Sequence, residues 1–359
     1  MEFYVCSTVR HLLFAVLRAN ARPQVQSHVV LFADYQGITP DLLDTEVLPD
    51  HIQVHLLSRR ATSKLQSKTL TGTLFYFLAM RDLPAPARFR RHFCEQLASL
   101  SPALSRALLE ADQPQMVLFN EKNKMARLFS RVVPQFSIIE DGEGNYRKLP
   151  VKTFKQLGRL LTGRTPSYKV FGESPRCRQV HLLTPERAPD SISHKAVKID
   201  FLDPKEQSAM VLTLFRLTPP AHTGQREAVL STQPIENIAG CGVAGKLTIY
   251  RTLIDALMAQ GYQVYLKIHP AEDTDQYQEF AQRCTVLNAK VPLEAILLGM
   301  PSVIPAISIL SAAGTGFEQH CHRLTLADTT LADTLGRWGS DPTRWQKALK
   351  QALVSVSND

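Results

Sequence analysis

The stretch FYVCSTVRHLLFAVLRA, residues 3–19, decides how the fold is interpreted, because a short apolar run passes directly into apolar residues at helical spacing. Its opening FYVC is predicted to form a strand and the remainder a helix. Arg10, His11 and Arg18 interrupt the apolar residues, whereas a signal peptide carries its positive charge ahead of its apolar core. The run is also too short for a membrane span, which needs roughly 18–20 apolar residues. The stretch therefore predicts the first strand and helix of an α/β fold.

The same alternation continues through the first half of the chain. Short runs rich in Val, Ile, Leu or Phe predict strands at 3–6, 28–33, 52–57, 116–119 and 135–139. Helical spacing predicts helices at 9–20, 69–82, 87–111 with a break near Pro102, and 122–130. Apolar strands that alternate with helices are typical of a parallel sheet covered by helices on both faces.

The second half repeats the pattern. Strands are predicted at 228–231, 263–268, 285–287, 302–309 and 323–327, and helices at 247–260, 292–298 and 342–355. A segment rich in Pro, Gly, Ser and Arg, residues 165–195, is interpreted as a linker. We therefore expect an α/β domain over 1–170 and a second over 171–359, whose last helix packs back on the first domain. Ligands of such sheets bind beyond the carboxyl ends of the strands.

Charge is distributed unevenly along the 359 residues, whose net charge is +8. Residues 1–170 hold 23 Lys and Arg against 14 Asp and Glu, and residues 171–359 hold 18 against 19. The whole positive excess lies in the first half, which predicts that the first domain meets an anionic partner. The six cysteines form no CxxC pair, and neither disulfides nor a metal site are expected.

The sequence EDGEGNY, residues 140–146, follows a predicted strand directly. Glu140 and Asp141 are therefore placed at the carboxyl end of that strand, and Gly142 allows a tight turn. Adjacent carboxylates oppose each other's ionisation, which favours a general base with a raised pKa. Either carboxylate fits this role, with a slight preference for Asp141. A turn with acidic residues on its rim is the alternative interpretation.

Further polar residues follow strands or begin helices in the second half. His269 comes after the predicted strand 263–268 and is followed by Pro270, so its ring could donate a hydrogen bond to a phosphate. Glu294 lies in the first turn of a predicted helix, where a carboxylate can accept hydrogen bonds from ribose hydroxyls. Ser308 and Ser311 lie at a strand end and a helix start, where hydroxyls and free amides bind phosphate. Helix capping would explain the glutamate and the serines equally well.

Two other segments have competing interpretations. Residues 240–246 fit the phosphate-loop pattern G-x-x-x-x-G-K, but Leu247 stands where Ser or Thr would hold Mg²⁺, so a flexible glycine-rich loop is favoured. Residues 147–169 hold seven basic residues and no acidic one. A helix from about residue 151 would group Val151, Phe154, Leu157 and Leu161 on one face, with Lys152, Lys155 and Arg159 on another. Such a helix could lie on an anionic membrane or an acidic polymer, or be an ordinary solvated helix.

Taken together and in order, these motifs resemble those of the bacterial sialyltransferases. That group shares a D/E-D/E-G motif, an HP motif and a later Ser/Thr motif, matched here by Glu140-Asp141-Gly142, His269-Pro270 and Ser311. The opening FYVCSTVRHLLFAVLRA and the run EDGEGNY are similar to the lipooligosaccharide sialyltransferases of glycosyltransferase family 52 and the related capsular polysialyltransferases. The landmarks span most of the chain.

The resemblance implies a GT-B fold, in which two Rossmann-like domains with parallel sheets face a central cleft. It implies an inverting transfer of sialic acid from CMP-sialic acid to a hydroxyl of a bacterial surface glycan, of lipooligosaccharide or capsular type, without a metal or other cofactor. A carboxylate of Glu140-Asp141 would be the general base and His269 would stabilise the departing phosphate. Ser311 and Ser308 would bind that phosphate, with Gly142 and Pro270 lining the site, and Glu294 would hold the ribose.

One departure concerns the Ser/Thr motif, because Ala312 stands where the family often has a second hydroxyl. A GT-B enzyme with a different nucleotide-sugar donor is therefore an alternative, and a non-enzymatic protein that binds an anionic glycan or a membrane is another. No nucleic-acid-binding motif is apparent. The expected partners are a nucleotide sugar, an anionic glycan or glycolipid acceptor, the inner membrane through 147–169, and a second copy in a homodimer. The expected location is cytoplasmic, peripheral to the inner membrane.

Overall fold

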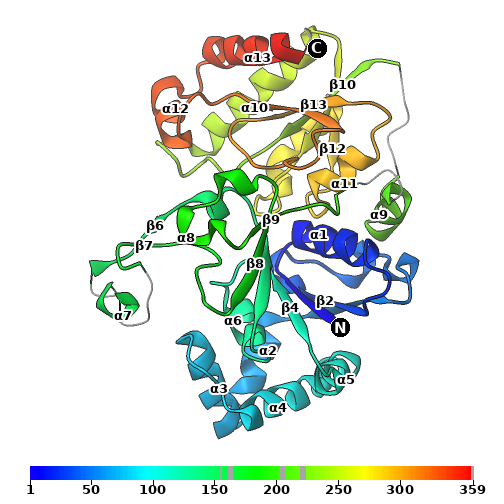
Figure 1. Cartoon of the computed structure of the whole chain (residues 1–359). Helices are drawn as coiled ribbons and strands as arrows, with labels where there is room; N and C mark the ends of the chain where they lie inside the picture. Colours follow the sequence, from blue (N-terminus) through cyan, green and yellow to red (C-terminus); the bar gives the residue numbers. More distant parts are fainter. Residues whose placement is uncertain (154–155, 161–164, 203–206, 219–223, 357–359) are drawn as a thin grey trace. The chain divides into compact units, whose positions relative to one another are not determined.

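The computed structural model describes residues 1–153, 156–160, 165–202, 207–218 and 224–356. The chain divides into two compact units, Met1–Gln207 and Ser208–Asp359. Each unit is built on a parallel sheet with helices packed against it (Figure 1).

The first unit has a parallel sheet with the strand order β3-β2-β1-β4-β5-β8-β9. Its strands are β1 (Glu2–Cys6), β2 (Ser27–Phe32), β3 (Ile52–Leu57), β4 (Gln115–Leu118), β5 (Phe136–Ile139), β8 (Cys177–Leu182) and β9 (Ala196–Lys198). Its helices are α1 (Val9–Asn20), α2 (Arg59–Gln66), α3 (Leu70–Met80), α4 (Ala87–Gln96), α5 (Pro102–Glu110), α6 (Lys124–Ser130) and α8 (Asp190–Ser193). A small antiparallel hairpin pairs β6 (Leu149–Pro150) with β7 (Tyr168–Lys169), and α7 (Gln156–Leu160) lies between them in sequence.

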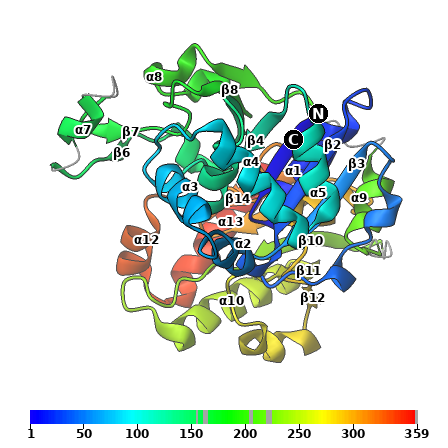
Figure 2. The ribbon, with the colours of Figure 1, turned by 90° about the horizontal axis from the view of Figure 1, so that it is seen from below.

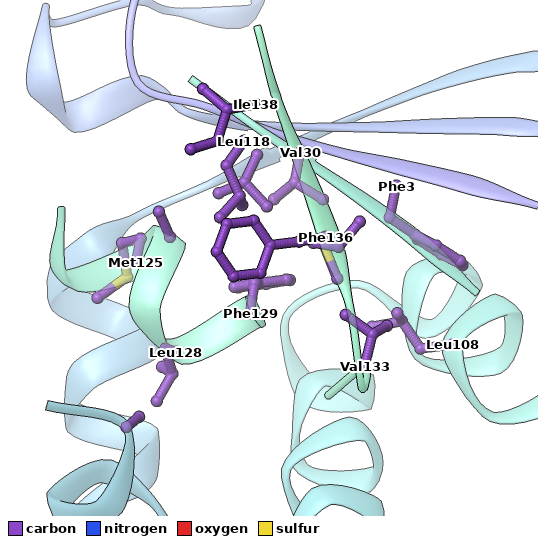
Figure 3. Packing of buried hydrophobic residues seen from close by; sticks show 14 of the residues in the cluster. Phe3, Val30, Leu108, Leu118, Met125, Leu128, Phe129, Val133, Phe136 and Ile138 are labelled. Carbon is purple, nitrogen blue, oxygen red and sulfur yellow. The ribbon is translucent and has the colours of Figure 1, made fainter. Parts of the chain in front are cut away.

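Apolar strands pack against apolar helix faces to form the core of this unit. Figure 3 shows Phe129 of α6 close to Leu118 and Phe136, which belong to neighbouring strands. Each of these side chains is at most 5% exposed, and burying one such side chain contributes about 1.5–3 kcal/mol. The turn from β1 into α1 is closed by Thr8, whose hydroxyl accepts a hydrogen bond from the His11 N–H at 3.1 Å.

The second unit has a parallel sheet with the strand order β12-β11-β10-β13-β14. Its strands are β10 (Arg226–Ser231), β11 (Tyr262–Lys267), β12 (Thr285–Leu287), β13 (Ile304–Ser308) and β14 (Cys321–Thr325). Its helices are α9 (Ser208–Leu214), α10 (Gly242–Ala259), α11 (Leu293–Leu298), α12 (Leu331–Trp338) and α13 (Pro342–Val356).

Both sheets are wound in the same way. The chain enters at an inner strand, adds the next two strands on one side, and then crosses to the other side of the first strand. The winding direction therefore reverses between β1 and β4 in the first unit and between β10 and β13 in the second. Ligands of doubly wound sheets bind at the carboxyl ends of the strands beside such a reversal, so these two places are where functional residues are expected.

The strands predicted from apolar runs are confirmed as β1–β5 and β10–β14, but the predicted division between domains is not where the structure places it. β8 pairs with β5, and β9 with β8, so residues of the predicted linker and second domain belong to the first sheet. Val180 and Leu182 of β8 are buried in the first core. The division therefore falls after residue 207 and not after residue 170.

One expectation about helices is also corrected. The helix expected from about residue 151 does not begin there, because Pro150 lies in the β6–β7 hairpin. In helix α13, Trp345, Leu349 and Leu353 are buried in the core of the second unit.

The basic segment 147–169 keeps only a short helix, α7, in its described part. Leu157 of this helix is exposed, whereas Arg159 pairs with Glu173 at 2.7 Å. Phe154, Lys155 and Leu161, which were assigned to its two faces, lie outside the described residues. Over the residues that the structure describes, no helix combines the length and the apolar character needed to cross a bilayer.

Candidate active site

The carboxyl ends of three strands meet around Asp141 in the first unit. Asp141 follows β5, Phe119 and Asn120 follow β4, and His11 lies in the first turn of the helix after β1. Asp141 Oδ1 lies 2.5 Å from His11 Nε2, and the Asn120 side-chain amide donates to Asp141 Oδ2 at 3.3 Å. This cluster therefore lies at the reversal between β1 and β4.

The hydrogen bonds of His11 define which nitrogen carries its proton. Nδ1 accepts a hydrogen bond from the Ser7 N–H at 3.2 Å, so in the neutral ring the proton is on Nε2, which donates to Asp141. The ring also stacks on Phe119, with centroids 4.2 Å apart and planes 5° from parallel. The His11 side chain is 3% exposed and that of Asp141 is 34% exposed. The carboxylate thus faces solvent, and the histidine supports it from inside the protein.

The environment of Asp141 favours its ionised form. Burial raises the pKa of this carboxyl, but the charge and hydrogen bond of His11, the charge of Arg10 and the hydrogen bond from Asn120 outweigh burial. The pKa therefore lies below its ordinary value, and the expectation of a raised pKa was wrong. The reason is that Glu140 turns away from Asp141, so its charge does not oppose ionisation there.

Glu140 is engaged in the protein interior. Its side chain accepts hydrogen bonds from the Tyr146 hydroxyl and, at 2.8 Å, from the Leu183 N–H. Glu140 is only 2% exposed, and Tyr146 in turn accepts from the Thr184 N–H at 3.1 Å. The glutamate therefore holds the segment after β8 against the site, and of the two carboxylates only Asp141 is presented to solvent.

Gly142 keeps the space beside Asp141 open. Its backbone φ of 137° is one that residues other than glycine rarely adopt, and no neighbouring atom lies within 4 Å of where a β-carbon would stand. The turn is closed by the Asn145 side chain, whose oxygen accepts from the Asp141 N–H at 2.9 Å. Asn145 thereby fixes the backbone from which the Asp141 carboxylate projects.

His269 lies at the carboxyl end of β11 in the second unit. Its backbone N–H donates to Thr232 Oγ1 at 2.9 Å, and its Nδ1 accepts from the Ala271 N–H at 3.2 Å. The proton of the neutral ring is therefore on Nε2, and the side chain, next to Pro270, is exposed. Partial desolvation and the nearby charge of Lys267 lower the pKa of His269, against an opposing effect of Glu272. A neutral ring with an outward N–H is suited to donate a hydrogen bond to an anion.

Thr232, which holds His269, is itself held by a buried ion pair. Its hydroxyl donates to Glu272, and Glu272 also accepts from Lys246 Nζ at 2.9 Å. Lys246 donates further to Glu236 at 3.1 Å and to Gln276 at 3.0 Å, which uses all three of its protons. Lys246 is therefore no phosphate-binding lysine. The flexible glycine-rich loop favoured for 240–246 was wrong as well, because α10 begins at Gly242 and residues 242–246 form its start.

The turn after β13 is held by a side chain that comes just after β10. The Gln233 side chain spans the Leu310 backbone, donating to its carbonyl and accepting from its N–H at 2.7 Å. Ser308 is buried in β13, and Ser311 Oγ accepts from the Ala313 N–H at 3.0 Å. These contacts fix the turn at the reversal between β10 and β13.

Glu294 lies in the first turn of α11, and its side chain contacts the same turn after β13. It is 2% exposed, and its Oε1 accepts from the Gly314 N–H at 3.2 Å. The predicted residue Glu294 is thus hydrogen-bonded to the loop that carries Ser311. His269 lies after β11, two strands away from β13 at the same edge of the sheet.

Sequence reasoning missed several residues of both clusters. His11 and Asn120 hold Asp141, while Thr232 and Gln233 hold His269 and the turn before Ser311. Asn120 and Thr232 each come just after an apolar strand, which is the signal that identified His269. His11 carried no such signal, since it lies within an amphipathic helix.

The two similarly wound units have the architecture of the GT-B fold. The structure is similar to that of an α/β-galactoside α-2,3-sialyltransferase from Photobacterium phosphoreum, at 12% identity and a TM-score of 0.50, covering 99% of this chain and 95% of that one. A spinosyn rhamnosyltransferase is also similar, at 13% identity and a TM-score of 0.47, covering 100% and 92%. A search of curated sequences finds no match.

The model of the alpha-2,8-polysialyltransferase family matches residues 118–313, more than half of the chain, and the chain belongs to that family. The protein is thus a glycosyltransferase of the sialyltransferase type, and the resemblance to the bacterial sialyltransferases is confirmed. The matched residues include Asp141, His269, Glu294 and Ser311 but not His11. Family membership as an enzyme sets aside the alternative of a non-enzymatic binding protein.

Proposed function

We propose that the protein transfers sialic acid from CMP-sialic acid to a hydroxyl of an acceptor glycan, with inversion and without a metal. The observation that carries the proposal is the solvent-facing Asp141 carboxylate, held by His11 and Asn120. An ionised carboxylate in a fixed orientation is suited to take the proton of an attacking hydroxyl.

In the proposed reaction, Asp141 accepts the proton of the acceptor hydroxyl as its oxygen forms a bond to the anomeric carbon of the donor sugar. The bond between that carbon and the phosphate oxygen breaks, and its electron pair leaves with CMP. Attack opposite to the leaving group gives inversion at the anomeric carbon. Glu140 takes no part as a base, because its carboxylate is buried and occupied by Leu183 and Tyr146.

The second unit supplies groups suited to the departing phosphate. His269 would donate its Nε2–H to a phosphate oxygen as negative charge develops. The Ser311 hydroxyl would bind the same group, together with that of Ser308. Glu294 would meet the ribose hydroxyls as a hydrogen-bond acceptor. A phosphate bound in this way needs no Mg²⁺, because these donors perform the electrostatic role of the ion.

We further propose that the acceptor is an anionic surface glycan of lipooligosaccharide or capsular type. The support is the net charge of +9 over residues 1–170, the part of the chain that carries Asp141. A basic domain attracts a polyanionic acceptor and raises its local concentration.

Binding of the donor is tested by the thermal midpoint with CMP, UDP and GDP in parallel. CMP should raise the midpoint, because binding to the folded state stabilises it. A rise of the thermal midpoint with UDP or GDP and none with CMP would show that the donor is another nucleotide sugar. That is the alternative that Ala312 leaves open.

Catalysis is tested by CMP release from CMP-sialic acid with a sialylated oligosaccharide acceptor. Asp141→Asn should lower kcat by about 10²–10⁴-fold, as expected for loss of a general base. The matched variant Glu140→Gln keeps an acceptor oxygen for Leu183 and should retain most of kcat. Equal loss in both variants would mean that Asp141 has no special role.

A further inference from the structure

Helix α3 has apolar side chains on both its inner and its outer side. The eleven residues LTGTLFYFLAM of Leu70–Met80 include no charged residue. Gly72, Phe75 and Ala79 are buried against the first unit. On the opposite side, Leu70 is 77%, Leu74 41% and Phe77 48% exposed. Their spacing of four and three residues places them in one stripe along the helix.

This stripe is not an isolated exposed residue but a continuous surface. Leu83, just beyond the helix, is 44% exposed as well. A helix that is apolar all round is normally enclosed by protein or lipid, and a continuous apolar patch at a surface marks an interaction site. Figure 1 and the view from below in Figure 2 show α3 beside α4 at the surface of the first unit.

Basic side chains surround the stripe. Arg81 follows Phe77 by one helical turn, and its guanidinium lies 4.9 Å from the Phe77 ring centroid. The other exposed basic residues of this region are Lys64, Lys68, Arg88 and Arg91. Both acidic residues of 64–95 are already paired, Asp82 with Arg131 and Glu95 with Arg91. The surface therefore combines apolar side chains with a net positive rim.

The surface is preformed. The Thr69 hydroxyl lies 2.9 Å from His92 Nε2, which joins the start of α3 to α4. Phe75 of α3 stacks on Phe93 of α4 with ring centroids 5.0 Å apart. These contacts hold the two helices together, so no ordering of the chain is needed before the stripe can bind.

We propose that the α3–α4 surface, formed by Leu70, Leu74, Phe77, Leu83 and the surrounding Lys and Arg side chains, docks the protein on a membrane rich in anionic lipid. The apolar stripe would enter the boundary between headgroups and acyl chains, and the basic side chains would meet lipid phosphates. This charge pattern favours anionic lipid over a protein partner, whose surface would have to supply both an apolar face and a ring of acids. The proposal does not depend on the donor or on the chemistry at Asp141.

The test is co-sedimentation of the full-length protein with phosphatidylcholine vesicles, with and without phosphatidylglycerol. Wild-type protein should bind the anionic vesicles and bind pure phosphatidylcholine at least about tenfold more weakly. Leu74→Ser/Phe77→Ser should reduce binding to anionic vesicles about tenfold or more, and Arg81→Gln/Arg88→Gln should make the remaining binding less dependent on phosphatidylglycerol. All these residues lie outside the catalytic clusters, so CMP release and the thermal midpoint check that each variant is folded.

The matched control is Leu157→Ser/Leu160→Ser, which removes two exposed apolar side chains of α7, 67% and 60% exposed, in the basic segment 147–169. This variant should bind anionic vesicles as the wild type does. Loss of binding in the α7 variant with unchanged binding in the α3 variant would move the docking surface to 147–169. Failure of the wild type to bind, or a dimer that Leu74→Ser/Phe77→Ser converts to a monomer without changing vesicle binding, would overturn the proposal.

Discussion

His11 Nε2 lies 2.5 Å from Asp141 Oδ1, although 130 residues separate them in sequence. The buried histidine donates its Nε2–H to the solvent-facing carboxylate, and the Ser7 N–H donates to its other ring nitrogen. A base needs both a proton-free oxygen and a fixed direction. In the proposed mechanism, this relationship makes His11 a positioning residue for Asp141 and not itself the base.

Replacing His11 should therefore change the pH dependence of the reaction. His11→Phe keeps a ring to stack on Phe119 but loses the hydrogen bond to Asp141. Because that bond lowers the pKa of Asp141, the acid limb of the kcat/KM profile should move to higher pH, with a rate loss of about tenfold near neutrality. His11→Gln, which retains an N–H donor, should restore part of the profile. An unshifted acid limb in His11→Phe would contradict the positioning role.

Removing the His269 side chain should affect the chemical step more than donor binding. The proposed hydrogen bond from Nε2 strengthens as charge develops on the phosphate, so His269→Ala should lower kcat by about 10²-fold or more with a smaller change in KM. Steady-state kinetics of CMP release measure both quantities. A rise in KM at unchanged kcat would show that His269 only binds the donor.

The protonation state of His269 gives a separate expectation. Desolvation and Lys267 lower its pKa below the ordinary value, so the ring of the free enzyme is neutral at about pH 7 and already carries Nε2–H. Wild-type kcat/KM should therefore stay level between about pH 7 and about pH 8. A fall over that interval that disappears in His269→Asn would show that the charged imidazolium is required.

The buried ion pair behind His269 should dominate the stability of the second unit. Lys246→Met leaves Glu272 and Glu236 without their shared cation, and breaking such a buried pair costs about 3–5 kcal/mol. Arg251→Met on the same helix removes an exposed pair with Glu279 and should cost about 0–1 kcal/mol. Urea denaturation measures the difference, and similar costs for both variants would argue against the role of the Lys246 network.

Acid should destabilise the first unit through a buried histidine pair. His28 Nδ1 lies 3.1 Å from His55 Nε2, and Ser101 Oγ lies 3.0 Å from His55 Nδ1. Burial lowers the pKa of His28, and burial together with His28 lowers the pKa of His55 to about 4, so the unfolded chain binds protons that the folded protein does not.

The stability from this pair is present above pH 6.5 and is lost as the pH falls from there toward about 4. For His55 the loss amounts to about 3 kcal/mol. Over this range the free energy of unfolding, measured by denaturation, should depend more steeply on pH for the wild type than for His55→Gln. Parallel pH dependence of the two would show that other groups cause the acid loss.

Much of the fold was predictable because it depends on local patterns. Strands such as 28–33 and 263–268 are short runs rich in apolar residues, and a run buried on both faces can be recognised without knowing its neighbours. Strand β8 was missed because CRQVHL is largely polar at its start, and its place beside β5 depends on a pairing that no local pattern specifies. Because β8 pairs with β5, the boundary between the units lies after residue 207 and not after residue 170.

The sequence by itself pointed to candidate site residues in the order of the chain: an acidic pair after one strand, a histidine after another and a serine before a turn. Only the tertiary structure distinguished Glu140 from Asp141, because burial or exposure of each carboxylate depends on where it points once β8 lies beside β5. It also brought in His11, since parallel strands place residues that are distant in sequence at one edge of the sheet. The sequence specifies the type of each residue, whereas the burial, the protonation state and the orientation of its side chain are set only when the strands pack side by side.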